Sequence, residues 1–191
     1  MTRNFLTFPP ARRSVACLVA LVAAVFALPA PAADPPPTVA SVDLARYVGK
    51  WYEIAKIPNR FQSHCASGTT ADYSRRADGL IDVVNRCVDR EGRGDEARGV
   101  ARVVDARSNA KLEVSFFSLF GWRPVWGDYW VLDLAPGYDY AVVGAPDRRY
   151  GWILARTAVL PPATRATIDE RLKALGYDPA RFENTVHHPA R

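Results

Sequence analysis

The sequence is poor in the residue types that most often carry catalysis or hold metals. Its 191 residues include only three cysteines, three histidines and one methionine. Its one long apolar run, from Val15 to Leu28, is about 14 residues, shorter than the ~20 that a membrane-spanning helix needs. We therefore expect neither a spanning helix nor a metal centre of clustered cysteine and histidine.

The first 32 residues have the order of a secretory signal peptide. They contain three arginines and no acid, and the small residues Ala30-Pro31-Ala32 follow the apolar run. We expect export with cleavage near Ala32, and Arg12-Arg13 leaves open the choice between the general and the twin-arginine route. Cys17 opens the apolar run instead of following it, so lipid attachment is not expected.

Cleavage would also remove most of the net positive charge. The whole chain has a formal charge of +5, and loss of three arginines lowers it to about +2. A nucleic-acid partner would need a basic face on the folded domain. We therefore expect no nucleic-acid binding.

Two cysteines, Cys65 and Cys87, would remain in the mature chain. In an exported protein such a pair indicates a disulfide more often than a metal site. A hairpin that turns near Asp78 would bring the two nearly opposite each other. His64 adjoins Cys65, and His187-His188 lie in a polar tail. Adjacent side chains on an extended chain point in opposite directions, so we predict neither a Cys-His nucleophile nor a metal site.

The remaining chain is a series of short strands separated by turns. Residues 33–40 are rich in proline and predict an extended, solvated linker. Beyond it, eight segments rich in β-branched and aromatic residues alternate with turn residues. They are 51–57, 69–75, 80–88, 98–105, 111–117, 128–134, 138–144 and 150–157. Eight strands with short links predict an all-β fold, an antiparallel up-and-down barrel.

One helix should follow the strands and lie against the outside of the barrel. Pro161-Pro162 can start it, and Gly176 can end it. Between them, Ile168, Leu172 and Leu175 keep the spacing of one helix face.

Side-chain alternation indicates what faces the interior. If Trp51 points inward, the first strand also turns Glu53, Ala55 and Ile57 inward, and it turns Tyr52, Ile54 and Lys56 outward. The other strands carry charge on the outward face, which argues against an outer-membrane barrel. Small inward residues, namely Ala55, Ala71, Gly99 and Ala101, favour an open cavity over a filled core.

Two motifs resemble the signatures of the lipocalin family. The first is Gly49-Lys50-Trp51-Tyr52-Glu53-Ile54-Ala55, preceded by residues 42–47, and the second is Trp152-Ile153-Leu154-Ala155-Arg156-Thr157 on the last strand. Residues 111–117 and 127–130 resemble the branch of bacterial lipocalins and apolipoprotein D. The resemblance spans residues 41–188, which we expect to be one lipocalin domain. It departs at the turn 134–138, where the family has an Asp-Tyr pair that contacts the closed end.

The resemblance implies roles for three residues at a closed end of the barrel. Trp51 closes that end, and the guanidinium of Arg156 lies across its ring, an arrangement that contributes about 0.5–2 kcal/mol. Gly49 allows the chain to turn from a segment that crosses the end of the barrel into the first strand. Trp51 is then a structural residue, and function is expected at the other end.

The open end should be lined by residues 57–68, 89–97, 118–127 and 145–149. We predict an apolar cup below it, formed by Tyr73, Asn85, Phe116, Tyr129 and Trp152. The predicted rim consists of Arg60, Phe120, Trp122, Arg123 and Trp126, whose large apolar members would surround the mouth or contact a partner. A disulfide between Cys65 and Cys87 would brace the mouth. Glu53, buried and acidic, should have a hydrogen-bonded structural role.

These features favour a carrier of a small amphiphile, with its chain in the cup and an anionic group near Arg60 and Arg123. The resemblance points in the same direction, to fatty acids or lysophospholipids in the cell envelope, in the periplasm or at the outer membrane. No cofactor and no catalytic residue are expected, because we find no inward histidine, free thiol or close carboxylate pair.

Alternatives remain open. One is an enzyme on the same barrel, of isomerase or de-epoxidase type, and another is a binder of a pigment or hydrophobic metabolite. The 118–127 loop could also make peripheral membrane contact or form a homodimer.

Overall fold

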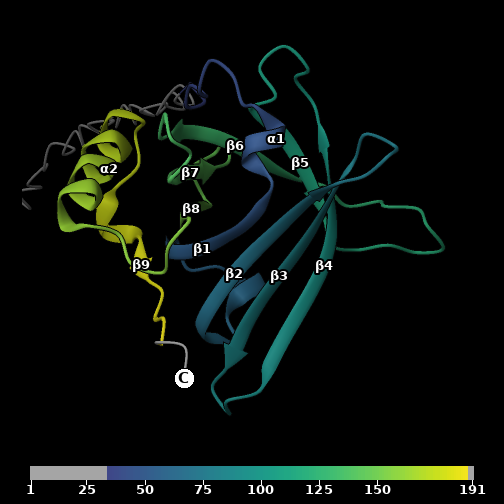
Figure 1. Cartoon of the computed structure of the whole chain (residues 1–191), viewed down its shortest axis with the longest axis horizontal. Helices are drawn as coiled ribbons and strands as arrows, with labels where there is room; N and C mark the ends of the chain where they lie inside the picture. The colour runs from purple at the N-terminus through teal and green to yellow at the C-terminus, as the bar shows by residue number, and fades with distance from the viewer. Residues whose placement is uncertain (1–33, 189–191) are drawn as a thin grey trace, which may run out of the picture. The chain divides into compact units, whose positions relative to one another are not determined.

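The computed structural model describes residues 34–188, so the predicted signal peptide lies outside the described residues. Eight antiparallel strands form a closed barrel, as the sequence predicts (Figure 1). Each strand pairs with the next one along the chain, and the first strand closes the barrel by pairing with both the second and the eighth. The strands are β1 (Gly49–Lys56), β2 (Cys65–Arg75), β3 (Ile81–Asp89), β4 (Gly94–Val103), β5 (Lys111–Ser115), β6 (Gly127–Leu134), β7 (Tyr140–Gly144) and β8 (Gly151–Ala155).

Short helices and one additional strand complete the described part of the chain. The helix α1 (Leu44–Tyr47) lies at one end of the barrel, and α2 (Pro162–Ala174) lies outside it, as predicted (Figure 1). Single turns of 3₁₀ helix occur at Arg60–Gln62 and Pro179–Arg181, and β9 (Glu183–Asn184) follows the second of them. Within residues 34–188, neither helix is long and apolar enough to cross a bilayer.

The predicted strands are in the right places but differ at their ends. The strands β2 and β4 begin four residues earlier than expected, at Cys65 and Gly94. The strand β5 stops at Ser115, two residues before its predicted end. The predicted linker also differs, because Pro36 is fully buried and the amide of Val39 donates a 3.0 Å hydrogen bond to Val131 O. Residues 34–40 therefore pack on the barrel.

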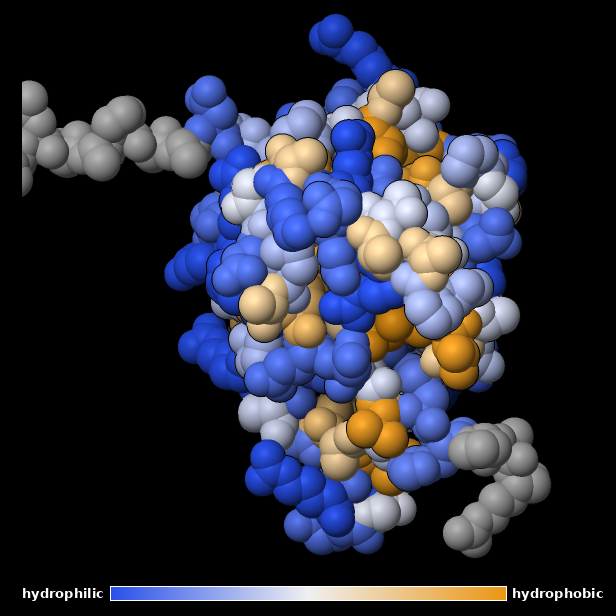
Figure 2. Space-filling model, turned by 90° about the vertical axis from the view of Figure 1, so that its left-hand side faces the viewer, coloured by the Kyte–Doolittle hydropathy of each residue, from blue (hydrophilic) through white to orange (hydrophobic). Residues whose placement is uncertain are grey.

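Two separate groups of buried apolar residues lie on the two sides of the barrel wall. The inner group includes Trp51, Val83, Leu112 and Val131. The outer group joins residues of β1, β6, β7 and β8 to Ile168, Leu172 and Leu175, which are the predicted apolar face of the helix. The helix therefore covers an apolar outer stripe that would otherwise face water. The surface on this side is mostly hydrophilic, with apolar residues in small separate groups (Figure 2).

The strand β1 does not keep one face inward along its whole length. Its register against β8 shifts between Glu53 and Ala55, which leaves Ile54 as an extra residue. A one-residue shift exchanges the two faces. The prediction that Ala55 and Ile57 point inward is therefore wrong, since both pack in the outer group. Lys56, predicted to point outward, bonds instead to the buried Glu53 at 2.9 Å.

The closed end is centred on the pair Trp51 and Arg156. The guanidinium carbon of Arg156 lies 3.8 Å from the centroid of the fully buried Trp51 ring. The same guanidinium donates hydrogen bonds to carbonyl oxygens of Arg46 (2.7 Å), Lys50 (2.9 Å) and Val48 (3.1 Å). These groups belong to the chain that enters β1. One side chain of β8 thus holds the crossing segment over the end of the barrel.

Glycine is required at the point where the crossing segment turns into β1. Gly49 has a φ of +94°, in the region that other residues rarely adopt. A Cβ placed there would make only an ordinary contact with Arg156 Nη1, at 3.5 Å, so the available space does not exclude a side chain. The position thus needs glycine for its backbone conformation.

The turn that departs from the family signature still makes closed-end contacts. The hydroxyl oxygen of Tyr138 accepts a 2.8 Å hydrogen bond from the amide of Asp43. The guanidinium carbon of Arg46 lies 4.0 Å from the Tyr138 ring centroid, and its Nη2 donates to Pro136 O at 3.0 Å. Tyr138 and Pro136 of this turn therefore hold the crossing segment at the closed end.

The C-terminal segment completes the barrel wall next to β1. The strand β1 pairs with β2 only from Gly49 to Tyr52. Beyond that point its Ala55 and Lys56 pair with β9, and the amide of Thr185 donates to Ile54 O at 2.9 Å. The amide of Gly68 in β2 donates to Val186 O at 2.8 Å. Residues 183–186 thus join two strands that have separated.

Replacing Arg156 by lysine should destabilise the protein. Lysine keeps the charge but loses the planar fork that reaches several carbonyl groups at once. We expect R156K to lower the free energy of unfolding by about 2–4 kcal/mol in urea denaturation. The control is R98K, at an exposed position on β4, for which we expect a change below about 0.5 kcal/mol. Equal stability of the two variants would contradict the role of Arg156.

Candidate ligand-binding site

The interior of the barrel contains a cavity of about 730 Å³. This volume lies within the range of about 300–1,000 Å³ that small-molecule sites occupy. The cavity extends from Tyr47 and Val48 at the closed end to Phe61 and Tyr150 at the mouth. Most of its lining is apolar, which suits a hydrophobic ligand.

All five residues predicted for the cup line this cavity: Tyr73, Asn85, Phe116, Tyr129 and Trp152. Their contact with a ligand stays a prediction. Of the small residues expected to leave space, Ala71 and Ala101 also line it. Gly99 leaves none, because a Cβ there would lie 2.7 Å from Cδ1 of the Phe116 ring. Ala55, as described above, faces the helix.

Three tyrosines form a hydrogen-bonded cluster where the cavity meets the closed end. The hydroxyl of Tyr129 in β6 bonds to that of Tyr47 in α1 at 2.8 Å and to that of Tyr73 in β2 at 3.0 Å. The ring of Tyr47 lies beside Trp51, with 5.0 Å between the ring centroids. We call these three residues the tyrosine floor.

Burial changes the acidity of the tyrosine floor. Removal from water disfavours the phenolate, and this is the main reason why the pKa of Tyr73 rises to about 12. Burial also raises the pKa of Tyr47 and of Tyr129 above the ordinary value. All three hydroxyl groups are therefore uncharged at neutral pH, and each keeps its proton.

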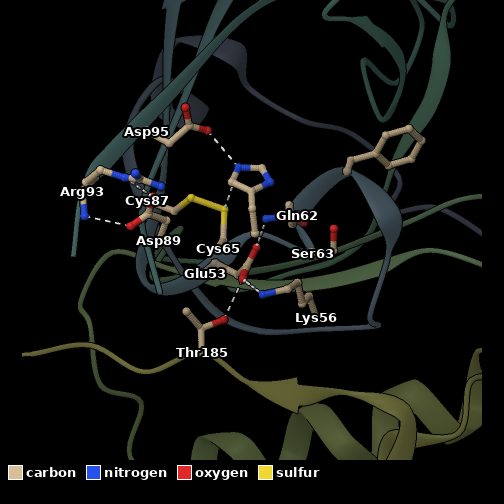
Figure 3. Close-up of a disulfide and its surroundings, with 12 residues drawn as sticks. Glu53, Lys56, Gln62, Ser63, Cys65, Cys87, Asp89, Arg93, Asp95 and Thr185 are labelled. Carbon is tan, nitrogen blue, oxygen red and sulfur yellow. Dashed lines mark hydrogen bonds and ion pairs between the residues drawn. A yellow bond between two sulfur atoms is a disulfide. The ribbon is translucent and has the colours of Figure 1, made fainter. Parts of the chain in front are cut away.

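Glu53, predicted to have a hydrogen-bonded structural role, holds three segments together. Its carboxylate is 3% exposed and accepts hydrogen bonds from Lys56 Nζ (2.9 Å), Gln62 Nε2 (2.6 Å) and Thr185 Oγ1 (2.6 Å). Figure 3 shows these side chains converging from β1, from the loop after β1 and from the C-terminal segment. Both carboxylate oxygens are engaged. Glu53 thus joins β1 to the loop after it and to the C-terminal segment.

The indole of Trp152 is connected to the same network. Its Nε1 donates a 2.9 Å hydrogen bond to Gln62 Oε1. Its ring stacks on Tyr150, with 6.1 Å between centroids and 14° between planes. Trp152 therefore presents an apolar ring to the cavity while its polar atom is already bonded.

The predicted disulfide lies beside the mouth. Cys65 begins β2 and Cys87 lies near the end of β3, and the two sulfur atoms are bonded (Figure 3). The expectation of no inward histidine is wrong, because His64 lines the cavity together with Asp95. His64 Nε2 lies 3.6 Å from Cys65 Sγ and 2.8 Å from Asp95 Oδ2. Because both thiols are engaged in the disulfide, neither is free to act as a nucleophile. The expectation that no metal binds here stays a prediction.

Comparison with known proteins identifies the family of this barrel. A family model described as lipocalin-like domain matches residues 42–187. The chain belongs to the lipocalin family. It is 39% identical over 150 residues to temperature-induced lipocalin-1 of Arabidopsis thaliana, covering 77% of this chain and 80% of the relative.

Further similarities support the branch that the sequence motifs indicate. This lipocalin is 35% identical over 170 residues to outer membrane lipoprotein Blc of Escherichia coli K12, covering 86% and 93% of the two chains. It is 33% identical over 159 residues to mouse apolipoprotein D, covering 78% and 79%. Among solved structures, insecticyanin of the tobacco hornworm Manduca sexta has a TM-score of 0.65 at 25% identity, covering 82% and 85%.

The residues predicted for the rim of this lipocalin lie in different places. Trp126 lines the cavity, and the guanidinium carbon of Arg102 lies 4.1 Å from its ring centroid. Arg60, Phe120, Trp122 and Arg123 are not part of the lining that the described residues form. Phe120 is fully exposed at 101% and Trp122 is 66% exposed, so neither side chain fills the mouth of the cavity. Their contact with a ligand stays a prediction.

Several lining residues were not predicted from the sequence. Tyr47 belongs to the crossing segment, whose signature suggested only a structural role. Phe61 and Gln62 lie in the loop after β1, directly after Arg60, which is the residue that its charge predicts. Thr69 lines the wall and is 4% exposed, and its hydroxyl has no partner among residues 34–188. An aromatic residue beside a polar one in a mouth loop is the signal that could have found Phe61.

The tyrosine floor makes the lipocalin sensitive to alkaline pH. Below pH 10 its hydroxyl groups are protonated in both the folded and the unfolded states. Above pH 10 the unfolded state ionises first, because folding raises the pKa of these groups, so stability is lost as pH rises toward 12. We expect the free energy of unfolding to fall above pH 10 by up to about 1.4 kcal/mol per pH unit for each floor tyrosine.

Urea denaturation across this pH range tests the expectation. Replacing Tyr73 by phenylalanine should make the decline with pH shallower, because one raised pKa is removed. The control replaces Tyr52, on the outward face of β1 and outside the tyrosine floor, by phenylalanine. It should leave the decline of the unfolding free energy with pH unchanged. Titration of all tyrosines near pH 10 in the folded protein, seen by phenolate absorbance, would contradict the prediction.

Proposed function

We propose that this lipocalin carries a single-chain amphiphile, such as a fatty acid or lysophospholipid, in the cell envelope. The observation that carries the proposal is the apolar cavity of about 730 Å³, closed at one end by Trp51 and Arg156. An acyl chain adds no polar atom of its own to such a space. The name of the bacterial relative, outer membrane lipoprotein Blc, supports export to the periplasm or outer membrane.

The state of the reactive groups near the cavity favours binding over catalysis. Both oxygens of Glu53 accept hydrogen bonds, Cys65 and Cys87 are joined, and the floor tyrosines are neutral. A general base or nucleophile needs an accessible lone pair near the reacting atom. These groups instead serve the architecture of the cavity.

Two arginines near the mouth are available for an anionic head group. Arg60 begins the 3₁₀ turn next to Phe61, which lines the mouth. Arg123 donates a 3.0 Å hydrogen bond to Ser115 O at the end of β5. Neither belongs to an ion pair among the described residues, whereas Arg149 at the mouth pairs with Asp147. We therefore keep Arg60 and Arg123 as the proposed head-group contacts.

The exposed apolar loop between β5 and β6 supports transfer from a lipid surface. Leu119, Phe120, Trp122 and Val125 are between 49% and 101% exposed. Side chains of this kind insert at the boundary between head groups and acyl chains. We propose that the loop contacts the membrane when a ligand enters or leaves. Dimerisation through the same loop stays a prediction.

Lipid binding can be tested directly on the purified protein. We expect native mass spectrometry to show a co-purified amphiphile, which solvent extraction then identifies. Added fatty acid or lysophospholipid should change tryptophan fluorescence in the wild type and in W130F, whose ring lies outside the cavity beside Lys111. The change should be smaller in W152F, which keeps Trp126 as the other tryptophan of the lining. Absence of both a bound lipid and a fluorescence response would overturn the carrier function.

The head-group contact gives a separate prediction. We expect R60Q/R123Q to weaken binding of an anionic amphiphile by about 1.4- to 5-fold per arginine at low salt, because each exposed ion pair contributes about 0.2–1 kcal/mol. The effect should shrink as salt is raised. The control is R107Q, in the loop between β4 and β5 at the closed end. Equal affinity of the wild type, R60Q/R123Q and R107Q in a displacement assay would show that Arg60 and Arg123 do not contact the head group.

A further inference from the structure

The tyrosine floor has one more hydroxyl proton than it has hydrogen bonds between its members. Three hydroxyl groups carry three protons, and the two hydrogen bonds among Tyr47, Tyr129 and Tyr73 use only two of them. No other hydrogen bond joins these hydroxyl groups to the rest of residues 34–188. Whichever way the chain of bonds runs, one O–H remains without an acceptor from the protein.

This spare donor lies in the deepest part of the apolar cavity. All three residues line the cavity, and Tyr47 and Tyr73 are only 5% and 9% exposed. A buried donor without an acceptor is destabilising, because it has lost its hydrogen bonds to water and gained none from the protein. A ligand that ends in a plain methyl group at this depth would leave that donor unpaired, whereas a ligand with an oxygen there would pair it.

The surroundings of the floor favour an uncharged oxygen. The nearest cation on the closed-end side, Arg156, lies across Trp51 and already donates to several backbone carbonyl groups. A carboxylate next to the floor would therefore be desolvated without a partner of opposite charge. A hydroxyl, keto or ester oxygen accepts the proton without that penalty.

A second unpaired hydroxyl lies farther along the same wall. Thr69 Oγ1 is buried and has no partner among the described residues, and Thr69 lines the cavity. It is four residues from Tyr73 on β2, which corresponds to about 13 Å along a strand. Thr69 thus adds an unpaired hydroxyl to the spare proton of the floor, but its oxygen is buried within the wall, so the floor proton is the donor that a ligand can reach.

We propose that the cavity selects amphiphiles whose buried end carries an uncharged oxygen acceptor, such as an oxygenated fatty acid, and that this oxygen binds the tyrosine floor. The inference rests on the proposed carrier function and narrows its ligand. The anionic group of such a ligand remains at the mouth, near Arg60 and Arg123. Tyr47, Tyr129 and Tyr73 then determine specificity for the far end of the chain.

The test compares saturated fatty acids, from lauric to stearic acid, with their ω-hydroxy derivatives of equal chain length. Affinities are measured by displacement of the fluorescent probe N-phenylnaphthylamine from the full-length mature protein. If the end of the cavity were purely apolar, the added ω-hydroxyl group would weaken binding, because it would lose its hydrogen bonds to water and gain none from the protein. At the chain length that reaches the floor, we expect the ω-hydroxy acid to bind about 5- to 10-fold more tightly instead.

The matched variant replaces all three floor tyrosines by phenylalanine. Removing every partner of a hydrogen-bonded group is nearly neutral for stability, whereas removing Tyr129 alone would leave two hydroxyl groups unpaired. We expect Y47F/Y73F/Y129F to prefer the plain fatty acid, and the control Y52F to behave like the wild type. Circular dichroism checks that the triple variant folds. If it does not, the wild-type comparison still decides.

The possible failures are distinguishable. If neither series displaces the probe, the proposed carrier function fails. If both series bind but the plain acids bind as well or better at every length, this inference alone fails, and a water molecule is then the partner of the spare proton. A preference for ω-hydroxy acids that persists in Y47F/Y73F/Y129F would also overturn the role of the tyrosine floor.

Discussion

The contact between Arg156 and Trp51 is the constraint on which the rest of the structure depends. A guanidinium that stacks on an indole face at 3.8 Å and donates to carbonyl groups of residues 46, 48 and 50 fixes three things at once. It anchors the crossing segment, it positions β1 against β8, and it places Tyr47 next to the cavity. The closed end is therefore also what positions the deepest polar groups of the binding site.

The mouth is organised by a different interaction, the buried carboxylate of Glu53. A buried charge persists only where its hydrogen-bonding capacity is met. Here Lys56, Gln62 and Thr185 meet it from β1, from the mouth loop and from the C-terminal segment. The bulge at Ile54 makes this possible, because it turns Lys56 toward Glu53 while Ala55 and Ile57 pack under α2. One strand thus serves both the cavity and the outer helix.

Much of this architecture could be predicted from residue patterns. Alternation in β2, β3 and β6 placed Tyr73, Asn85 and Tyr129 on the inner face, and helical spacing identified the face of α2. The bulge could not be predicted, because its signal is a register shift between strands that are about 100 residues apart, β1 and β8. The tyrosine floor also escaped prediction, because it joins side chains of α1, β2 and β6 that meet only when the barrel closes. Local sequence patterns predict which face of a strand or helix points inward. Contacts between side chains across the barrel depend instead on how the strands close, which local patterns do not contain.

The distribution of polar groups separates two kinds of recognition within the same barrel. Charged groups at the mouth lie near water, where pairing with an anion is weak and salt-dependent. Hydroxyl groups at the floor lie in apolar surroundings, where an unpaired donor is costly and a neutral acceptor satisfies it. Under the carrier function and the floor specificity that we propose, the head group of a ligand is held loosely, while the chemistry of its far end has the larger effect on affinity. In that proposal discrimination increases with depth, from electrostatic attraction at the rim to hydrogen bonding at the floor.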